Sequence, residues 1–259
     1  MSEVVLSEIG DGIATLTINR PDQRNALTGD VLRGLTSAFH GFRHDESVRA
    51  VVLTGSGDRA FCAGADLAEM VAPATEVERH RARGLFVETF MAAAHLGKPL
   101  IGAVNGHALG GGFGLALCCD LLVAADNATF ATPEITVGLW PMVIMPVITR
   151  NLGRKRAMEL MMTGRRISAA TAEQWGFVNT VVAQDQVLSV ALRWASDIGR
   201  WSPLVISMGR DAFYGTADLG LEDALRFLHG QFTILSLSAD SREGVSAFVE
   251  KRQPKFAGR

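Results

Sequence analysis

The sequence has few cysteines, and they form neither a disulfide framework nor a zinc motif. Its 259 residues include three, Cys62, Cys118 and Cys119, of which two are adjacent. An odd number of cysteines without zinc spacing fits a reducing compartment better than a cross-linked secreted fold. The N-terminus also lacks the basic segment and the apolar run of an export signal. We therefore expect a cytoplasmic protein without a metal site.

An excess of charge and a long apolar run are missing as well. The formal net charge is −2, which gives no support for binding to nucleic acid or to an anionic membrane. The most apolar run, residues 135–148, contains Gly138, Pro141 and Pro146. It is also shorter than the roughly 18 residues that a membrane-spanning helix requires. We expect neither a nucleic-acid partner nor a membrane partner.

Glycine, by contrast, is concentrated in one turn near the middle of the chain. Two apolar runs, Leu100–Val104 and Leu121–Ala125, enclose the turn at residues 110–114 and a small-residue segment at 115–119. This order predicts a strand, a tight turn, the start of a helix and another strand. Such a turn lets a ligand approach the backbone, and the helix start presents unpaired N–H groups to an oxyanion.

Two other interpretations of this turn are open. It can serve helix–sheet packing alone, or it can hold a phosphate. The chain contains neither G-x-x-x-x-G-K-[ST] nor G-x-G-x-x-G, which counts against the phosphate.

The remaining pattern predicts an α/β core followed by a helical region. A hairpin is expected at Asp11-Gly12, and Thr28 is expected to cap a helix. Further helices are predicted at residues 76–96, 141–151, 154–163 and 169–175, strands at 4–9, 13–19, 50–54 and 178–182, and a small-residue loop at 60–67 with Gly64 at positive φ. From residue 186 the pattern is almost wholly helical. We place the core at residues 1–199 and the C-terminal helical region at 200–259.

Several segments, taken in order, carry a recognisable signature. They are Asn19-Arg-Pro with Asn25-Ala-Leu, Val51-Val-Leu-Thr-Gly, Phe61-Cys-Ala-Gly-Ala-Asp-Leu, residues 99–120, Pro133-Glu134-Ile, Leu160-Met-Met-Thr-Gly, Gly176-Phe-Val-Asn and residues 243–252. Together they resemble the crotonase superfamily, the enoyl-CoA hydratase/isomerase family. The resemblance implies an α/β fold, a spiral of ββα units with a C-terminal helical region. It also implies a homotrimer or homohexamer and an acyl-CoA substrate. Coenzyme A is part of that substrate, so no separate cofactor is expected.

The resemblance also implies where the chemistry takes place. In this family two backbone N–H groups stabilise a thioester enolate, and they match Ala65 and Gly111. Hydratases of the family use two glutamates, but the first position is Gly114 here and only the second is present, as Glu134. Moving a double bond requires one base, so the resemblance favours an isomerase with Glu134 as acid and base. The alternative for Glu134 is a helix N-terminal residue after Pro133.

Substrate-binding positions follow from the same resemblance. Coenzyme A is expected at Arg24, Ala63 and Leu67, and at Phe248 and Lys255 of a C-terminal segment that reaches a neighbouring subunit. The acyl pocket is expected at Leu139, Trp140 and Met142. The alternatives are solvated charges for the basic residues and a buried helix start for the last three.

Three functions stay open at this point. The first is the isomerase. The second is a hydratase in which Glu134 acts alone or in which another acid, such as Asp66 or Glu69, replaces the missing one. The third is an inactive CoA-binding scaffold. Asp66 is expected to cap the helix that follows it. We interpret His107 as strand-end packing and Cys62 as a small core residue.

Overall fold

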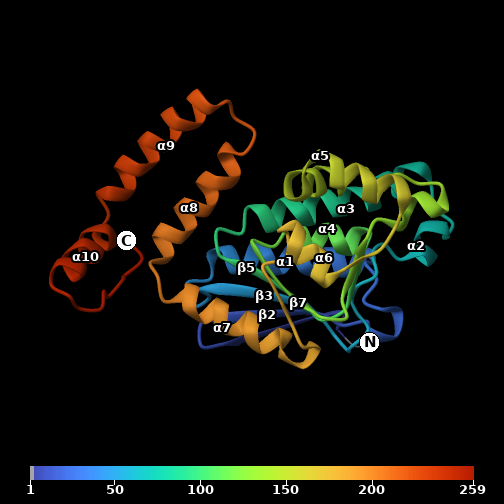
Figure 1. Ribbon diagram of the computed structural model, residues 1–259, viewed down its shortest axis with the longest axis horizontal. Coiled ribbons are helices and arrows are strands. Elements are labelled where there is room, and N and C mark those ends of the chain that lie inside the picture. Colours follow the sequence, from blue (N-terminus) through green and yellow to red (C-terminus); the bar gives the residue numbers. More distant parts are fainter. Residues whose placement is uncertain (1–2) are drawn as a thin grey trace.

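The computed structural model describes residues 3–259 and contains two β-sheets covered by helices (Figure 1). The large sheet has six strands. In sheet order these are β1 (Val5–Gly10), β2 (Ile13–Ile18), β3 (Ala50–Gly55), β5 (Leu100–Val104), β7 (Leu121–Ala125) and β10 (Thr180–Val182). All neighbours are parallel except the β1–β2 hairpin. β3 and β5 are buried along their whole length, as expected for parallel strands with both faces covered.

The hairpin forms where the sequence predicts it. Asp11 and Gly12 have φ angles of 51° and 78°. Both are in the left-handed region that a type I′ turn requires. Val5 pairs with Ile18 and Gly10 with Ile13.

A second, smaller sheet was not apparent from the sequence. Its strands, in sheet order, are β4 (Ala60–Cys62), β6 (His107–Leu109), β8 (Thr129–Ala131) and β9 (Ile167–Ser168). The prediction of a loop across residues 60–67 was therefore wrong for 60–62, because strands of two or three residues are too short to show a periodicity. β4, β6 and β8 are parallel. Their carboxyl ends therefore meet at one edge of the small sheet.

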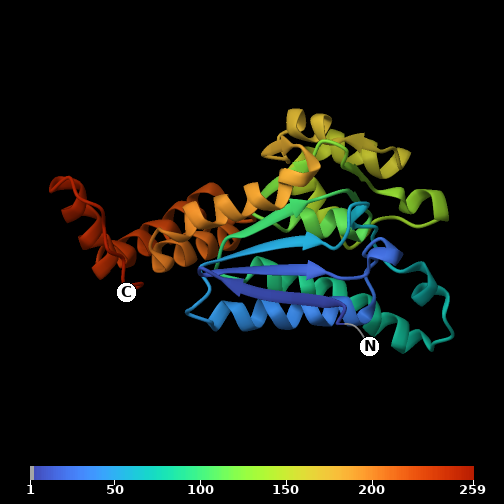
Figure 2. The ribbon, with the colours of Figure 1, turned by 90° about the horizontal axis from the view of Figure 1, so that it is seen from below.

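Helices cover both faces of the large sheet. Figure 2 shows α1 on one face and α7 on the other, where α7 contacts β3, β5 and β7. The helices of the first two hundred residues are α1 (Gly29–His44), α2 (Leu67–Val71), α3 (Glu76–Ala94), α4 (Gly111–Leu117), α5 (Met145–Thr163), α6 (Ala169–Trp175) and α7 (Val187–Gly199). Three short 3₁₀ helices, η1 (Pro21–Gln23), η2 (Pro133–Val137) and η3 (Gln184–Gln186), complete this part. Thr28 caps α1 as predicted, its side chain accepting a hydrogen bond from the Val31 N–H.

Several predicted boundaries were wrong by one to four residues, and two of these errors have a clear physical reason. The helix expected from residue 141 begins at Met145, with Pro146 in its first turn, where a helix tolerates a proline. It continues to Thr163 across Gly153, whose φ of 69° and ψ of 166° interrupt it at the predicted point. The strand expected from residue 178 begins at Thr180, because the Val178 N–H donates back to Ala172 O, near the end of α6.

The C-terminal helices extend away from the two sheets. They are α8 (Pro203–Thr216), α9 (Leu221–Ser236) and α10 (Ala239–Val249), and in both views they form an arm on one side of the molecule (Figures 1 and 2). The predicted α/β class with a helical C-terminal region is thus confirmed, whereas its division at residue 200 stays a prediction. Within residues 3–259, no helix combines the length and the apolar character needed to cross a membrane.

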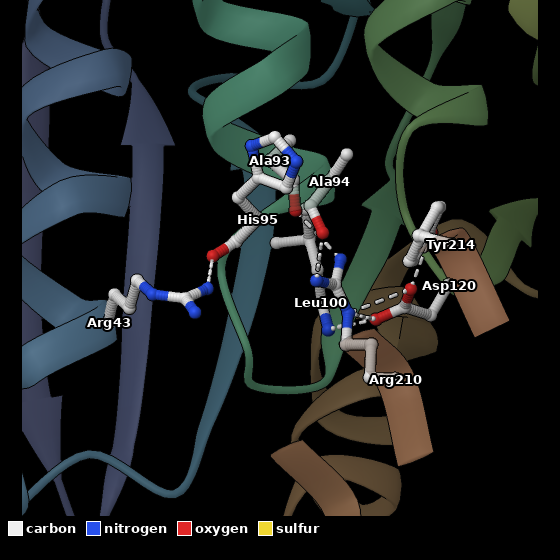
Figure 3. Close-up of polar contacts among 8 residues, drawn as sticks. All are labelled: Arg43, Ala93, Ala94, His95, Leu100, Asp120, Arg210 and Tyr214. Atoms are coloured by element: carbon white, nitrogen blue, oxygen red, sulfur yellow. Dashed lines mark hydrogen bonds and ion pairs between the residues drawn. The ribbon is translucent and has the colours of Figure 1, made fainter. Parts of the chain in front are cut away.

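Helix α8 is joined to the sheets by a polar network around the buried Arg210 (Figure 3). The Arg210 guanidinium donates to both oxygens of Asp120, at 2.8 and 3.1 Å, and to the carbonyls of Ala93 and Ala94, each at 2.7 Å. Those carbonyls end α3, where a cation is favoured by the helix dipole. Asp120 also accepts hydrogen bonds from the Leu100 N–H at the start of β5 and from the Tyr214 hydroxyl.

Candidate active site

Three segments meet at the edge where β4, β6 and β8 end. They are the loop at residues 63–65, the glycine turn before α4, and Pro133–Val137 (η2). Gly64 has the positive φ predicted for it, 93°. A Cβ atom at Gly64 would lie 2.7 Å from Leu109 O and 3.2 Å from Gly111 N. Only glycine therefore allows the loop to lie this close to the glycine turn.

Two backbone N–H groups are free at this contact. A parallel bridge pairs Ala65 with Leu27 through the Leu27 and Asp66 N–H groups, which leaves the Ala65 N–H unused. Gly111 is the first residue of α4, where an N–H has no partner within the helix. Neither N–H donates to an acceptor within residues 3–259. A Cβ atom at Gly111 would lie 3.7 Å from Ala65 N, so both donors border one small volume. Such a pair suits a developing oxyanion.

Glu134 brings a carboxylate to the same place. It lies in the first turn of η2, just after β8. Its Oε1 would be 2.9 Å from a Cβ atom at Gly110, the residue before the free Gly111 N–H. Its Oε2 is buried and has no hydrogen-bond partner within residues 3–259. Helix capping therefore does not account for this side chain.

Burial raises the pKa of Glu134, and its own backbone N–H opposes the shift. The ionised carboxylate is desolvated and has no cation beside it to compensate. A carboxyl group with a raised pKa is suited to accepting a proton and returning it.

The same burial predicts a stability effect. The pKa of Glu134 is higher in the folded protein than in the unfolded chain, where it is about 4.3. Below about pH 4.3 the contribution of Glu134 to the free energy of unfolding is fully present. It is lost as the pH rises through the pKa of the folded protein. Glu134→Gln is therefore expected to raise the thermal unfolding midpoint at neutral pH. The difference should shrink as the pH falls towards 4. Thermal scans over this range test it, with the exposed Glu88→Gln as the control. A shift of equal size at every pH would contradict this origin.

The surroundings of Gly114 leave no room for a glutamate, the residue found at this position in hydratases of the family that the sequence resembles. A Cβ atom at Gly114 would lie 2.4 Å from Ile144 Cγ2 and 3.0 Å from Phe90 Cζ. Ile144 is 4% exposed and Phe90 8%. The volume of the missing carboxylate is therefore filled with hydrocarbon.

Neither of the two neighbouring acids is free to take its place. Asp66 caps α2 as predicted, accepting a hydrogen bond from the Ala68 N–H at 3.0 Å, and it pairs with Arg20 at 2.9 Å. Glu69 accepts a hydrogen bond at 3.0 Å from the Gly29 N–H, at the start of α1. Both carboxylates thus hold helix ends.

A basic cavity of about 520 Å³ opens beside the loop at residues 63–65. Arg24 and Ala63 both line it, and the Ala63 N–H donates to Arg24 O at 3.0 Å. Its other basic residues are Arg59, His107 and Arg166. Sequence patterns did not reveal Arg59 or Arg166, whereas His107 stands close enough to the glycine turn in the sequence to be considered for a ligand. These lie in different segments of the chain, so only the fold shows that they are close.

His107 and Cys62 were both interpreted as structural. The interpretation of His107 as strand-end packing is incomplete, because it lies on β6 and faces the cavity, with Nδ1 2.9 Å from Thr129 Oγ1. Burial lowers its pKa, and the nearby Arg166 and Arg24 lower it further. Cys62 is fully buried as predicted, and burial raises its pKa to about 12. Its thiol therefore stays protonated and is no nucleophile.

The roles of the other predicted binding residues stay predictions, although the Leu139 N–H donates to Glu134 O at 3.0 Å. Trp140 packs partly buried against the core, whereas Leu139 and Met142 are exposed. Leu67, on α2, is exposed as well. Phe248 on α10 and Lys255 are exposed, and in both views α10 lies at the opposite end of the molecule from α2 (Figures 1 and 2).

Over residues 3–259, no three His, Cys, Asp or Glu side chains are grouped so that they could hold a metal ion.

Comparisons with known proteins match both the sequence and the fold. The profile of the enoyl-CoA hydratase/isomerase family matches residues 8–259. The 2,3-dehydroadipyl-CoA hydratase of Escherichia coli K12 is 38% identical over 260 residues, which cover 100% of both chains. The crystal structure of an enoyl-CoA hydratase from Mycobacterium smegmatis has a TM-score of 0.94 at 37% identity and covers 98% of both chains. One from Bacillus anthracis has a TM-score of 0.94 at 31% identity, over 99% of this chain and 100% of that one.

Proposed function

The chain belongs to the enoyl-CoA hydratase/isomerase family, and on this basis we propose that it moves the double bond of an enoyl-CoA thioester with Glu134 as the only acid and base. The observation that carries the proposal is the pairing of a buried, unpartnered Glu134 carboxylate with a Gly114 whose surroundings leave no space for a second one. Acyl-CoA chemistry follows from the family, whereas the choice of reaction is the proposal.

The proposed reaction needs only the three groups at the edge of the small sheet. The Ala65 and Gly111 N–H groups donate to the thioester oxygen. Glu134 removes a proton from C2 of a 3-enoyl-CoA, and the electron pair forms a dienolate on that oxygen. Glu134 then returns the proton to C4, so that the double bond lies between C2 and C3. Loss of one oxyanion donor typically costs about 2.7–4 kcal/mol.

Hydration is the second candidate, because the Escherichia coli and Mycobacterium smegmatis relatives are named hydratases. In that reaction Glu134 would activate water without a second acid, because Asp66 and Glu69 are occupied elsewhere. An inactive CoA-binding scaffold is disfavoured, because a desolvated carboxylate beside two free N–H groups has no structural role. Parallel incubations with 3-enoyl-CoA and with 2-enoyl-CoA separate the three. The isomerase converts 3-enoyl-CoA to a product of unchanged mass, the hydratase converts 2-enoyl-CoA to a product heavier by a water, and the scaffold changes neither substrate.

Coenzyme A is proposed to lie in the basic cavity, with its phosphates at Arg24, Arg59 and Arg166 and its adenine beside Ala63 and Leu67. Two observations support this position. The cavity adjoins the free N–H groups through Ala63, and three guanidinium groups around it suit an anionic ligand.

Arg24→Ala and Arg166→Ala are each expected to weaken CoA binding about ten-fold, equivalent to about 1.4 kcal/mol. Each removes one charged partner of a phosphate and leaves the sheets untouched. Titration calorimetry with CoA measures the effect, and the affinity should fall as salt is added. Arg226→Ala, on the distant α9, is the matched loss of one positive charge. Equal affinities for all three variants would place CoA elsewhere.

Assembly as a trimer or hexamer is proposed to complete the CoA site with Phe248 and Lys255 of a neighbouring subunit. The C-terminal helices support this, because they expose many large apolar side chains. These include Phe213, Leu225, Phe232, Leu237 and Phe248. A concentration of exposed apolar side chains on one set of helices is typical of an interaction site.

A further inference from the structure

One face of α4 is covered by hydrocarbon side chains. Gly111 and Gly114 lie three residues apart, so they share this face. A Cβ atom at Gly111 would lie 2.9 Å from Phe86 Cε1. At Gly114 the same position is occupied by Ile144 and Phe90. Phe86 and Phe90 contact each other edge to face, with ring centroids 6.5 Å apart. We call Phe86, Phe90 and Ile144 the apolar wall.

Ile144 holds the part of the wall nearest the missing carboxylate. It is the residue just before α5, and its backbone is fixed at both ends. The Met145 N–H donates to Pro141 O at 2.9 Å, and the Ile148 N–H donates to Ile144 O at 3.0 Å. A β-branched side chain is also stiff at χ1. Ile144 therefore cannot turn aside without moving the backbone.

A wall of this composition offers nothing to a water molecule. An ordered water in a buried site needs two to four polar partners. The three wall side chains contribute none. The unpartnered polar groups nearby are the two free N–H groups, Glu134 and the hydroxyl of Thr132, which precedes Glu134 by two residues. The N–H groups are taken by the thioester oxygen in the proposed reaction, so on the side of the apolar wall a water would have no hydrogen-bond partner.

We infer that Ile144 determines the outcome of the reaction, because it occupies the space from which a water would add to the double bond. This inference rests on the proposed function and names the residue that keeps the reaction from becoming a hydration. In the proposed reaction Ile144 would border the reacting part of the acyl group, and it has no group that transfers a proton. It is thus a specificity-determining residue.

The test measures which product forms rather than how fast. Wild type, Ile144→Ala and the double variant Gly114→Glu/Ile144→Ala are incubated with 3-enoyl-CoA and 2-enoyl-CoA. Both products are quantified by liquid chromatography coupled to mass spectrometry, because the two enoyl-CoA isomers have the same mass. In wild type the ratio of 3-hydroxyacyl-CoA to 2-enoyl-CoA should stay at the detection limit, and in the double variant it is expected to rise about ten-fold or more above that limit. Ile144→Ala alone is expected to raise the ratio less, because it adds space without a second carboxylate.

Ile148→Ala is the matched control, because Ile148 is fully buried one turn further along α5. It removes the same side-chain atoms and should leave the product ratio unchanged. Where Ile144→Ala does not fold, Ile144→Val opens a smaller space and should shift the ratio in the same direction.

Three outcomes overturn the inference. The first is that folded variants at Ile144 keep the wild-type product ratio. This outcome overturns the inference about Ile144 and leaves the proposed function standing. An equal shift in Ile148→Ala would make the effect a general loosening of α5. Wild-type protein that itself forms 3-hydroxyacyl-CoA would overturn the proposed function together with the inference.

Discussion

Glu134→Gln is expected to slow double-bond migration by about 10²- to 10⁴-fold, the usual contribution of a positioned acid–base group. Glutamine keeps the size of the side chain but cannot accept the proton from C2. Because burial raises the pKa of Glu134, the wild-type rate should also rise with pH above the ordinary range of a carboxyl group. That limb of the pH–rate profile should be missing in the variant. Steady-state rates with 3-enoyl-CoA across a pH series measure both effects.

Two controls separate lost chemistry from lost binding. CoA affinity should be unchanged in Glu134→Gln, because the basic cavity does not include this side chain. Glu88→Gln, on the exposed face of α3, should keep the full rate. A Glu134→Gln enzyme with the wild-type rate would remove Glu134 from the mechanism.

Arg210→Met is expected to destabilise the protein by about 2–3 kcal/mol, less than the range found for a fully buried ion pair, because the Asp120 side chain is 24% exposed and water partly solvates the charge left behind. The Arg210 side chain is 7% exposed, and its loss leaves the Asp120 carboxylate without its cation. It also leaves the Ala93 and Ala94 carbonyls at the end of α3 without a donor (Figure 3). Unpaired buried acceptors carry their own desolvation cost. Urea unfolding, followed by circular dichroism, measures the change.

An exposed ion pair of the same kind provides the comparison. Arg226 and Glu222 lie 2.6 Å apart on α9, with side chains 75% and 78% exposed. Arg226→Met should therefore cost about 0.5 kcal/mol or less. If Arg210→Met were no more destabilising than Arg226→Met, the network in Figure 3 would not be what holds α8 to the sheets.

Elements with a clear apolar pattern or a capping residue could be predicted from the sequence. The bounds of β5, β7 and α6 match the expected residues, because apolar runs and capping residues mark both ends. The small sheet could not be predicted, because its strands have two or three residues and leave no periodic signal. Yet this sheet is what brings the loop at 63–65, the glycine turn and Glu134 together.

The candidate site was predictable only in its motifs. Gly64 and the glycine turn show a backbone that approaches a ligand, and the family resemblance supplied Ala65, Gly111 and Glu134. Neighbours that depend on tertiary packing left no local signal. The wall residue Ile144 is 30 positions from Gly114, and Arg24 and Arg166 meet at one cavity from opposite ends of the core. Proximity of this kind follows from topology and cannot be deduced from one sequence.

A proton NMR time course in deuterated water tests the proposed reaction most directly, with 3-enoyl-CoA and 2-enoyl-CoA as substrates. We expect the double bond to migrate between the two positions, without 3-hydroxyacyl-CoA and without activity in Glu134→Gln. Accumulation of 3-hydroxyacyl-CoA that depends on Glu134 would contradict the proposal and make the protein a single-glutamate hydratase.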